Sequence, residues 1–161
     1  MYYSTDYASP LGRMLIVSDG ESVCGLWFCG QKHFLSSIDD EITENNDLTI
    51  FSEVKNWLDD YLSGKNPDIT FKLKPSGSDF RLKVWRILED IPYGQTLTYG
   101  EIASKISPTM SPQAVGGAVG RNPISILIPC HRVLGSGGKL TGYAGGVNRK
   151  IELLKLEKSI F

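Results

Sequence analysis

The first part of the chain alternates short apolar runs with turn-forming residues. Each run is rich in aromatic and β-branched residues, which is typical of strands, and residues 9–12 and 18–21 between the runs carry Pro, Gly, Asp and Ser. Strands joined by such short turns pair in an antiparallel sheet. The predicted strands are residues 2–8, 13–18 and 22–28.

Two apolar stripes with helical spacing follow the predicted sheet. Apolar residues recur every four positions over residues 34–42 and indicate a short helix in an acidic segment. A stronger stripe over residues 54–62 predicts a helix that Ser52 caps and Gly64 ends. Residues 65–78 contain two prolines and little periodicity, so we predict a linker there.

The second half of the chain has a helical pattern with clear start signals. Apolar residues fall on one helix face over residues 80–91 and are followed by a Pro-Tyr-Gly stop. Thr98 and Glu101 have the spacing of a capping box and predict a second, short helix. Ser111 followed by Pro112 predicts the start of a third. Two short helices joined by a tight turn resemble a helix-turn-helix unit.

The helix predicted after Ser111 is nearly bare of side chains, which lowers its helix propensity. A helix that reads the major groove needs polar side chains to recognise base edges. A bare helix instead suits close approach of its backbone to a minor groove, with little sequence readout. Tight helix packing inside the domain is the alternative. The small residues are Ala114, Gly116, Gly117, Ala118 and Gly120.

Charge is distributed unevenly along a chain of otherwise ordinary composition. The 161 residues are 41% hydrophobic and 22% charged, as expected for one or two small globular domains. Residues 1–78 hold 6 basic against 12 acidic side chains, a net of −6, whereas residues 79–161 hold 11 against 6, a net of +5. A basic half favours a polyanionic partner. We therefore predict an α+β chain with a small antiparallel-sheet domain at 1–75 and a mainly helical DNA-binding domain at 76–161.

The three cysteines are an odd number, which argues against a disulfide framework and for a reducing compartment. No apolar run approaches the ~20 residues of a membrane span, and residues 1–6 lack the features of a signal peptide. We expect a cytoplasmic protein with no membrane association. Cys24, Cys29 and His33 are spaced like zinc ligands, but a fourth ligand is missing, so we predict no metal site.

The segment Ile128-Pro129-Cys130-His131-Arg132-Val133 carries the strongest chemical signal. Cysteine is a strong nucleophile as its thiolate, and histidine is the next residue in the chain. The apolar run over residues 124–128 predicts a buried strand that ends at a proline-enforced bend. An extended backbone would send Cys130 and His131 to opposite faces, so a turn or a bridging water would have to connect them. A buried structural cysteine is the alternative interpretation.

Glu157 lies three and four residues after Leu154 and Leu153, on the apolar stripe of the last helix. A carboxylate in that position requires a partner, because burying it alone is unfavourable. We expect His131 to be that partner, although a partly exposed residue near the chain end is the alternative.

Three further blocks accompany the cysteine segment: Gly120-Arg121-Asn122-Pro123, Leu140-Thr141-Gly142-Tyr143-Ala144-Gly145-Gly146 and Leu153-Leu154-Lys155-Leu156-Glu157. Together the four blocks resemble the O6-alkylguanine-DNA alkyltransferase family over residues 79–161, and the likeness continues weakly into the N-terminal half. The resemblance implies a ribonuclease-H-like N-terminal domain and a reaction that needs no cofactor. An alkyl group would pass irreversibly from O6-alkylguanine in double-stranded DNA, or from O4-alkylthymine, to Cys130, and each protein would act once.

The resemblance also assigns roles to individual residues. His131, oriented by Glu157, would draw the proton from Cys130 through a water, which predicts a depressed thiol pKa. Asn122 would brace the turn before the cysteine segment, and Tyr99 would stand by the 3′ phosphate and assist the departure of guanine. The backbone carbonyls of Cys130 and Leu140 would bind the guanine amino group. The remaining substrate and DNA contacts would be Ser111, Gln113, Ala114, Gly117, Arg121, Arg132, Leu140, Tyr143 and Ala144.

Gln113 departs from the family pattern. Many members carry arginine there, which replaces the target base when that base is flipped out of the duplex. Glutamine can insert and hydrogen-bond, but it lacks the charge and the planar stacking group of arginine. We expect a monomer that binds the minor groove.

Three other functions fit parts of the sequence. A non-catalytic binder of alkylated DNA, like the alkyltransferase-like proteins, would lack the acceptor cysteine that this chain has at Cys130. A thiol hydrolase with the same trio would turn over on a small ester. A helix-turn-helix regulator is disfavoured by the bare second helix and by the lack of a sensory or dimerisation element.

Overall fold

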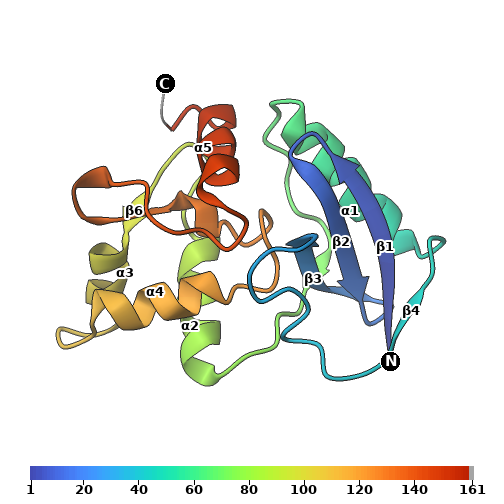
Figure 1. Cartoon of the computed structure of the whole chain (residues 1–161), viewed down its shortest axis with the longest axis horizontal. Coiled ribbons are helices and arrows are strands. Elements are labelled where there is room, and N and C mark those ends of the chain that lie inside the picture. Colours follow the sequence, from blue (N-terminus) through green and yellow to red (C-terminus); the bar gives the residue numbers. More distant parts are fainter. Residues whose placement is uncertain (160–161) are drawn as a thin grey trace. The chain divides into compact units, whose positions relative to one another are not determined.

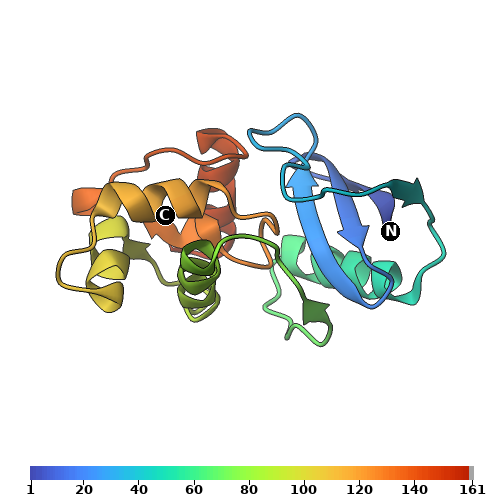
Figure 2. The same cartoon turned by 90° about the horizontal axis from the view of Figure 1, so that it is seen from below.

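The computed structural model describes residues 1–159 and divides the chain into two compact units, which Figures 1 and 2 show in two views. The first unit holds residues 1–76 together with 123–125, and the second holds residues 77–122 and the chain from 126 onward. The first unit contains a sheet with one long helix, and the second is mainly helical. The predicted α+β fold class is confirmed.

The first unit is built on a five-stranded sheet in the order β4-β1-β2-β3-β5. The three central strands form the predicted antiparallel meander, and the two short outer strands, which were not predicted, pair in parallel with β1 and β3. The strands are β1 (Tyr2–Ser9), β2 (Gly12–Ser18), β3 (Ser22–Phe28), β4 (Ile42–Glu44) and β5 (Lys72–Leu73).

The helix predicted over residues 34–42 is wrong. Residues 32–37 form turns, and Ile42 begins strand β4 instead. His33 and Leu35 both have left-handed backbone angles, with φ of 62° and 60°, which no α-helix contains. The apolar Phe34 packs edge-on against Trp27 of β3, with ring centroids 6.0 Å apart. Phe34 is therefore apolar because it packs on the sheet, and not because it belongs to a helix.

Helix α1 (Thr49–Leu62) lies along one face of the sheet, as both views show. Its apolar stripe is the predicted one, but the helix begins three residues before Ser52 because Ile50 and Phe51 are buried as well. The Tyr7 hydroxyl of β1 donates a hydrogen bond to Asp59 of the helix at 2.6 Å, which ties the two layers together.

The apolar run over residues 124–128 is buried, but it is not the predicted strand. Only Ile124 pairs with the sheet, as an isolated bridge to Leu26, with two backbone hydrogen bonds of 2.9 Å that run from Leu26 to Pro123 and from Ser125 to Leu26. Ile126 then takes a left-handed φ of 69°, which ends extended structure. Periodicity alone cannot distinguish a buried strand from a buried irregular segment.

The second unit contains the two short helices that the sequence predicted. Thr98 and Glu101 form both hydrogen bonds of the capping box, and Ser111 accepts a hydrogen bond from the Ala114 amide. The helices α2, α3 and α4 lie together (Figure 2), and α3 and α4 form the predicted helix-turn-helix-like pair. The helices are α2 (Asp79–Glu89), α3 (Tyr99–Ile106), α4 (Pro112–Gly120) and α5 (Val147–Leu156).

A two-stranded parallel sheet inside the second unit was not predicted. Strand β6 (Leu97–Thr98) directly precedes α3, and β7 (Val133–Leu134) directly follows the short 3-10 helix η1 (Cys130–Arg132). A second 3-10 helix, η2 (Ser136–Gly138), comes after β7. Pairing of these strands brings the start of α3 beside the cysteine segment. Within residues 1–159 no helix has the length and apolar character that crossing a membrane requires.

Candidate active site

Cys130 lies at the exit of a tight turn. Pro129 has φ −79° and ψ 66°, the angles of an inverse γ-turn, and the Cys130 amide donates to the Ile128 carbonyl at 2.8 Å. Proline suits the centre of this turn because its ring fixes φ near that value. The chain then winds into η1, which leaves Cys130 only 5% exposed.

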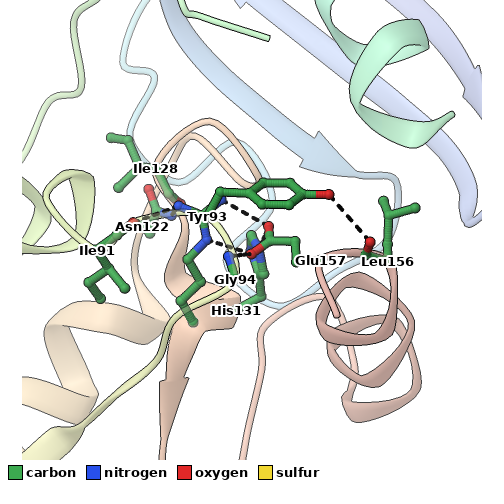
Figure 3. A network of polar contacts seen from close by, with 9 residues as sticks. Ile91, Tyr93, Gly94, Asn122, Ile128, His131, Leu156 and Glu157 are labelled. Atoms are coloured by element: carbon green, nitrogen blue, oxygen red, sulfur yellow. Dashed lines mark hydrogen bonds and ion pairs between the residues drawn. The ribbon is translucent and has the colours of Figure 1, made fainter. Parts of the chain in front are cut away.

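Asn122 holds this turn in place. It directly follows Arg121, the residue that caps the end of α4. Its side-chain amide nitrogen donates to the Ile128 carbonyl at 2.8 Å, as Figure 3 shows. The same carbonyl therefore accepts from both Asn122 and Cys130, which uses both of its lone pairs. Through this hydrogen bond Asn122 holds the turn before Cys130, the position that was predicted for it.

His131 and Glu157 are brought together in the interior, 26 residues apart in sequence. Nε2 of His131 lies 2.7 Å from Oε2 of Glu157, and both side chains are fully buried (Figure 3). An ionised carboxylate can only accept, so Nε2 carries the hydrogen and Nδ1 keeps the lone pair. Because η1 is helical rather than extended, Cys130 and His131 follow a turn and are not held on opposite faces.

Arg132 is also inside this network, although the sequence assigned it to DNA. Its Nε and Nη2 donate to Oε1 and Oε2 of Glu157 at 2.7 and 2.9 Å, and Nη1 donates to the Ile91 carbonyl at 2.6 Å. The Gly94 amide donates to Glu157 at 3.4 Å, and the Tyr93 hydroxyl donates to the Leu156 carbonyl (Figure 3). Glu157 therefore sits at the centre of a polar network within the domain.

Burial shifts the pKa values of both Cys130 and His131 toward the neutral forms of the two side chains. Burial raises the pKa of the Cys130 thiol, although hydrogen bonding by Asn122, the charge of Lys150 and hydrogen bonding by Tyr143 lower it. Burial also lowers the pKa of His131, more than its hydrogen bond to Glu157 raises it. Burial therefore opposes the thiolate at Cys130, whereas Asn122, Lys150 and Tyr143 favour it.

Lys150 is a site residue that the sequence prediction missed. It is fully buried, and its Nζ donates to the Thr141 and Gly142 carbonyls at 2.9 and 3.3 Å, which holds the loop before α5. Burial lowers its pKa to about 8, and the Nζ lies 6.0 Å from the centre of the Tyr99 ring. The signal was present, because Lys150 precedes Leu153 and Leu154 on the same helical stripe as Glu157.

The predicted DNA contacts on α4 lie on its exposed side, while Val115, Ala118 and Val119 are buried. The Trp85 indole donates to the Ala118 carbonyl at 2.9 Å, so part of the small-residue pattern does serve helix packing. The exposed residues are Ser111, Gln113, Ala114, Gly117 and, at the helix end, Arg121.

A cavity of about 600 Å³ opens between the starts of α3 and α4 and the η2 segment. Tyr99 lines it and is also close enough to Cys130 for the two groups to interact electrostatically. In the loop that follows, Leu140 is exposed, and Tyr143 and Ala144 are half-buried. The cavity is lined by Thr98, Tyr99, Gly100, Pro112, Gln113, Gly116, Ser136 and Gly137.

The zinc-like spacing in the first unit forms no metal site in the described part of the chain. No group of three or more potential ligand side chains gathers among residues 1–159. Cys24 is buried inside β3, as the strand prediction implied, and all three cysteines are free thiols.

Comparison with known proteins gives the family. Residues 79–159 match the family described as 6-O-methylguanine DNA methyltransferase, DNA binding domain, and residues 1–75 match its ribonuclease-like domain. A methylated-DNA–protein-cysteine methyltransferase of Methanosarcina acetivorans is 43% identical over 159 residues, 99% of each chain. One from Haemophilus influenzae is 42% identical over 97% of this chain and 86% of its own.

Solved structures agree with this assignment. The crystal structure of Mycobacterium tuberculosis O6-methylguanine methyltransferase has a TM-score of 0.87 and 40% identity, covering 99% of this chain and 94% of its own. The M. tuberculosis OGT in complex with DNA has a TM-score of 0.86 and 41% identity, covering 98% and 92%. The chain belongs to the methylated-DNA–protein-cysteine methyltransferase family.

Proposed function

We propose that this protein repairs DNA by transferring one alkyl group from O6-alkylguanine to the sulfur of Cys130. The sulfur–carbon bond forms as the carbon–oxygen bond to guanine breaks. The observation that carries the proposal is a buried cysteine on a turn braced by Asn122, followed at once by a histidine paired with a buried carboxylate. The thioether product has no route to hydrolysis in this scheme, so the protein acts once.

The proton of Cys130 would pass to Nδ1 of His131, directly or through one water. Glu157 supports this step because it accepts from Nε2 and so leaves the lone pair on Nδ1. The departing guanine gains electron density on its oxygen and ring nitrogens and needs a proton donor. Tyr99 lines the cavity and is a candidate donor, since burial raises its pKa and keeps the hydroxyl protonated.

The partner is double-stranded DNA, bound through the exposed side of α4 in the minor groove by a monomer. Several features support this: the basic half of the chain, the exposed helix start at Ser111 and Gln113, and the small side chains of Ala114 and Gly117. A target base stacked in a duplex must be flipped to reach Cys130. The cavity beside Tyr99 is the candidate receiving site.

Intact-mass measurement after mixing with a duplex containing O6-methylguanine is expected to show one added methyl group per protein. Peptide mapping should place that methyl on Cys130, because Cys24 is buried in the sheet and Cys29 is not in this site. A label on Cys24 or Cys29 would contradict the proposal. Multiple turnovers on excess substrate would instead indicate a thiol hydrolase.

Gln113→Arg is expected to speed repair of duplex DNA and to leave the reaction with free O6-alkylguanine base unchanged. Gln113 is exposed at the start of α4, where an arginine could fill the vacated position in the base stack. Second-order transfer rates for both substrates test this. Ser52→Arg, on the exposed side of α1, adds the same charge as a control. An equal gain on both substrates, or the same gain from Ser52→Arg, would show that Gln113 does not fill the stack.

A further inference from the structure

The loop between β7 and α5, residues 135–146, brings side chains to two sides of the candidate site. Its first part lines the cavity. Farther along, the Thr141 side chain lies within hydrogen-bonding reach of the Tyr99 hydroxyl. The Tyr143 hydroxyl is buried and lies within hydrogen-bonding reach of the Cys130 sulfur. The position of this loop therefore determines where these groups stand around a bound base.

Backbone hydrogen bonds within this loop close it on itself. The Gly135 and Thr141 amides both donate to the Lys139 carbonyl, at 2.8 and 3.1 Å. Residues 136–142 are exposed. These bonds determine the shape of the loop, but they do not attach it to the rest of the second unit.

Two consecutive cations at the start of α5 provide an attachment. Nζ of Lys150 donates to the Thr141 and Gly142 carbonyls at 2.9 and 3.3 Å, and the lysine side chain is fully buried. Nη1 of Arg149 donates to the Gly145 carbonyl at 3.1 Å. The two side chains therefore hold the later part of the loop to the helix at three points.

The start of a helix is an unfavourable place for cations. The N-terminus of a helix carries a partial positive charge, which favours acidic side chains and disfavours basic ones. Helix α5 has no acidic residue in its first turn, and its N-cap, Gly146, provides no side-chain hydrogen bond. Residues that break a local rule in this way are expected at functional sites. The two cations therefore serve the loop and not the helix.

We propose that Arg149 and Lys150 are positioning residues that fix the 135–146 loop at the cavity during alkyl transfer. The three carbonyls that they hold lie on both sides of Tyr143 in the chain, so this attachment keeps Tyr143 beside Cys130. The inference rests on the proposed function, in which Cys130 is the alkyl acceptor. A displacement of about 1 Å at a reacting centre can slow a reaction about 100-fold, so the hold on the loop contributes to the rate.

The first test measures the attachment by hydrogen exchange of the full chain. Lys150→Met removes the donors and keeps the length of the side chain. It should fold, because Thr141 and Gly142 are exposed and water can replace the lost hydrogen bonds. Exchange is expected to be faster in peptides that cover residues 139–146 and unchanged in peptides from α2 and α4. The control is Lys155→Met, which removes the same charge from the exposed side of α5 and should leave loop exchange unchanged.

The second test separates positioning from DNA binding. With duplex containing O6-methylguanine, Lys150→Met is expected to slow the transfer step in the complex about 10- to 100-fold and to leave the dissociation constant for DNA unchanged. Transfer from free O6-alkylguanine base should slow by a similar factor, because the base enters the same cavity. Lys150→Arg restores a cation with N–H donors and should be several-fold faster than Lys150→Met. Lys155→Met should react at the wild-type rate.

Arg149→Met tests the second cation and covers the case in which Lys150→Met does not fold. Arg149 is only half-buried, and its loss should also speed loop exchange and slow transfer from both substrates. Wild-type loop exchange in either folded variant, or faster exchange with a wild-type transfer rate, would overturn the proposal. So would slower transfer from duplex alone, which would place the cations in DNA binding, or an equal change in Lys155→Met. If the wild-type protein transfers no alkyl group, the proposed function fails, and the exchange measurements still decide whether the two cations hold the loop.

Discussion

Cys130→Ala is expected to abolish alkyl transfer completely and to leave binding to undamaged duplex DNA unchanged. The sulfur is the only atom in the site that can accept the alkyl group in the proposed reaction, so no residual rate should remain. Binding rests on the exposed side of α4, whose residues do not include Cys130. The same preparation is examined by intact mass after mixing with alkylated duplex and by a DNA-binding titration.

The matched control is Cys29→Ala, which removes a half-buried thiol from the first unit. It should retain the wild-type transfer rate and stoichiometry. Transfer that persists in Cys130→Ala, or that disappears in a folded Cys29→Ala, would place the acceptor elsewhere. Loss of DNA binding in Cys130→Ala, with an unchanged melting temperature, would mean that the cysteine takes part in recognition.

His131→Ala is expected to slow transfer by about 10²–10⁴-fold, the range by which a positioned general base contributes. Glu157→Gln should also slow transfer, because an amide can donate to Nε2 and shift the lone pair away from Nδ1. Since the two side chains form one hydrogen-bonded unit, the double variant should be little slower than the slower single variant. Transfer to free O6-alkylguanine base isolates this chemistry from base flipping.

Both substitutions change buried groups, so stability must be measured beside the rate. Glu157→Gln leaves Arg132 without its carboxylate, and breaking a buried pair destabilises by about 3–5 kcal/mol. A denaturant titration gives the folded fraction, and rates are compared per folded molecule. If folded His131→Ala and Glu157→Gln transfer at the wild-type rate, His131 is not the base. If their effects multiply in the double variant, the two residues act separately.

Local signals in the sequence predicted much of the fold. The capping box at Thr98 and the cap at Ser111 each depend on hydrogen bonds between residues three positions apart. Such pairs can be recognised in a short stretch of sequence. The start of α1 was missed because its capping residue, Leu48, makes no side-chain capping bond. Strands β4 and β5 are only three and two residues long, and pairing with distant strands determines them.

In the candidate site, too, residues in contiguous sequence blocks were predicted, and contacts between distant residues were not. The cysteine segment, Asn122 and Glu157 were found because they belong to contiguous blocks that resemble a known family. The position of Arg132 could not be read from those blocks, since its partners are Glu157 and the Ile91 carbonyl, 25 and 41 residues away. Burial of Cys130 depends on the fold around the turn, so the rise that burial causes in its thiol pKa could not be read from the sequence.

Residues 123–125 belong to the first unit, although the chain on both sides of them belongs to the second. A gene fragment that starts at residue 77 would therefore carry Pro123 and Ser125 without Leu26, to which both are hydrogen-bonded. Residues 123–125 would then lack their partner in the sheet. They lie in the chain between Asn122 and the Cys130 turn, so the change in structure would be close in sequence to the reactive residue. A domain can be exchanged or inherited alone only where it contains all the residues of its own compact unit. In this protein the second half of the chain supplies residues 123–125 to the first unit, so a cut at residue 77 leaves neither unit complete.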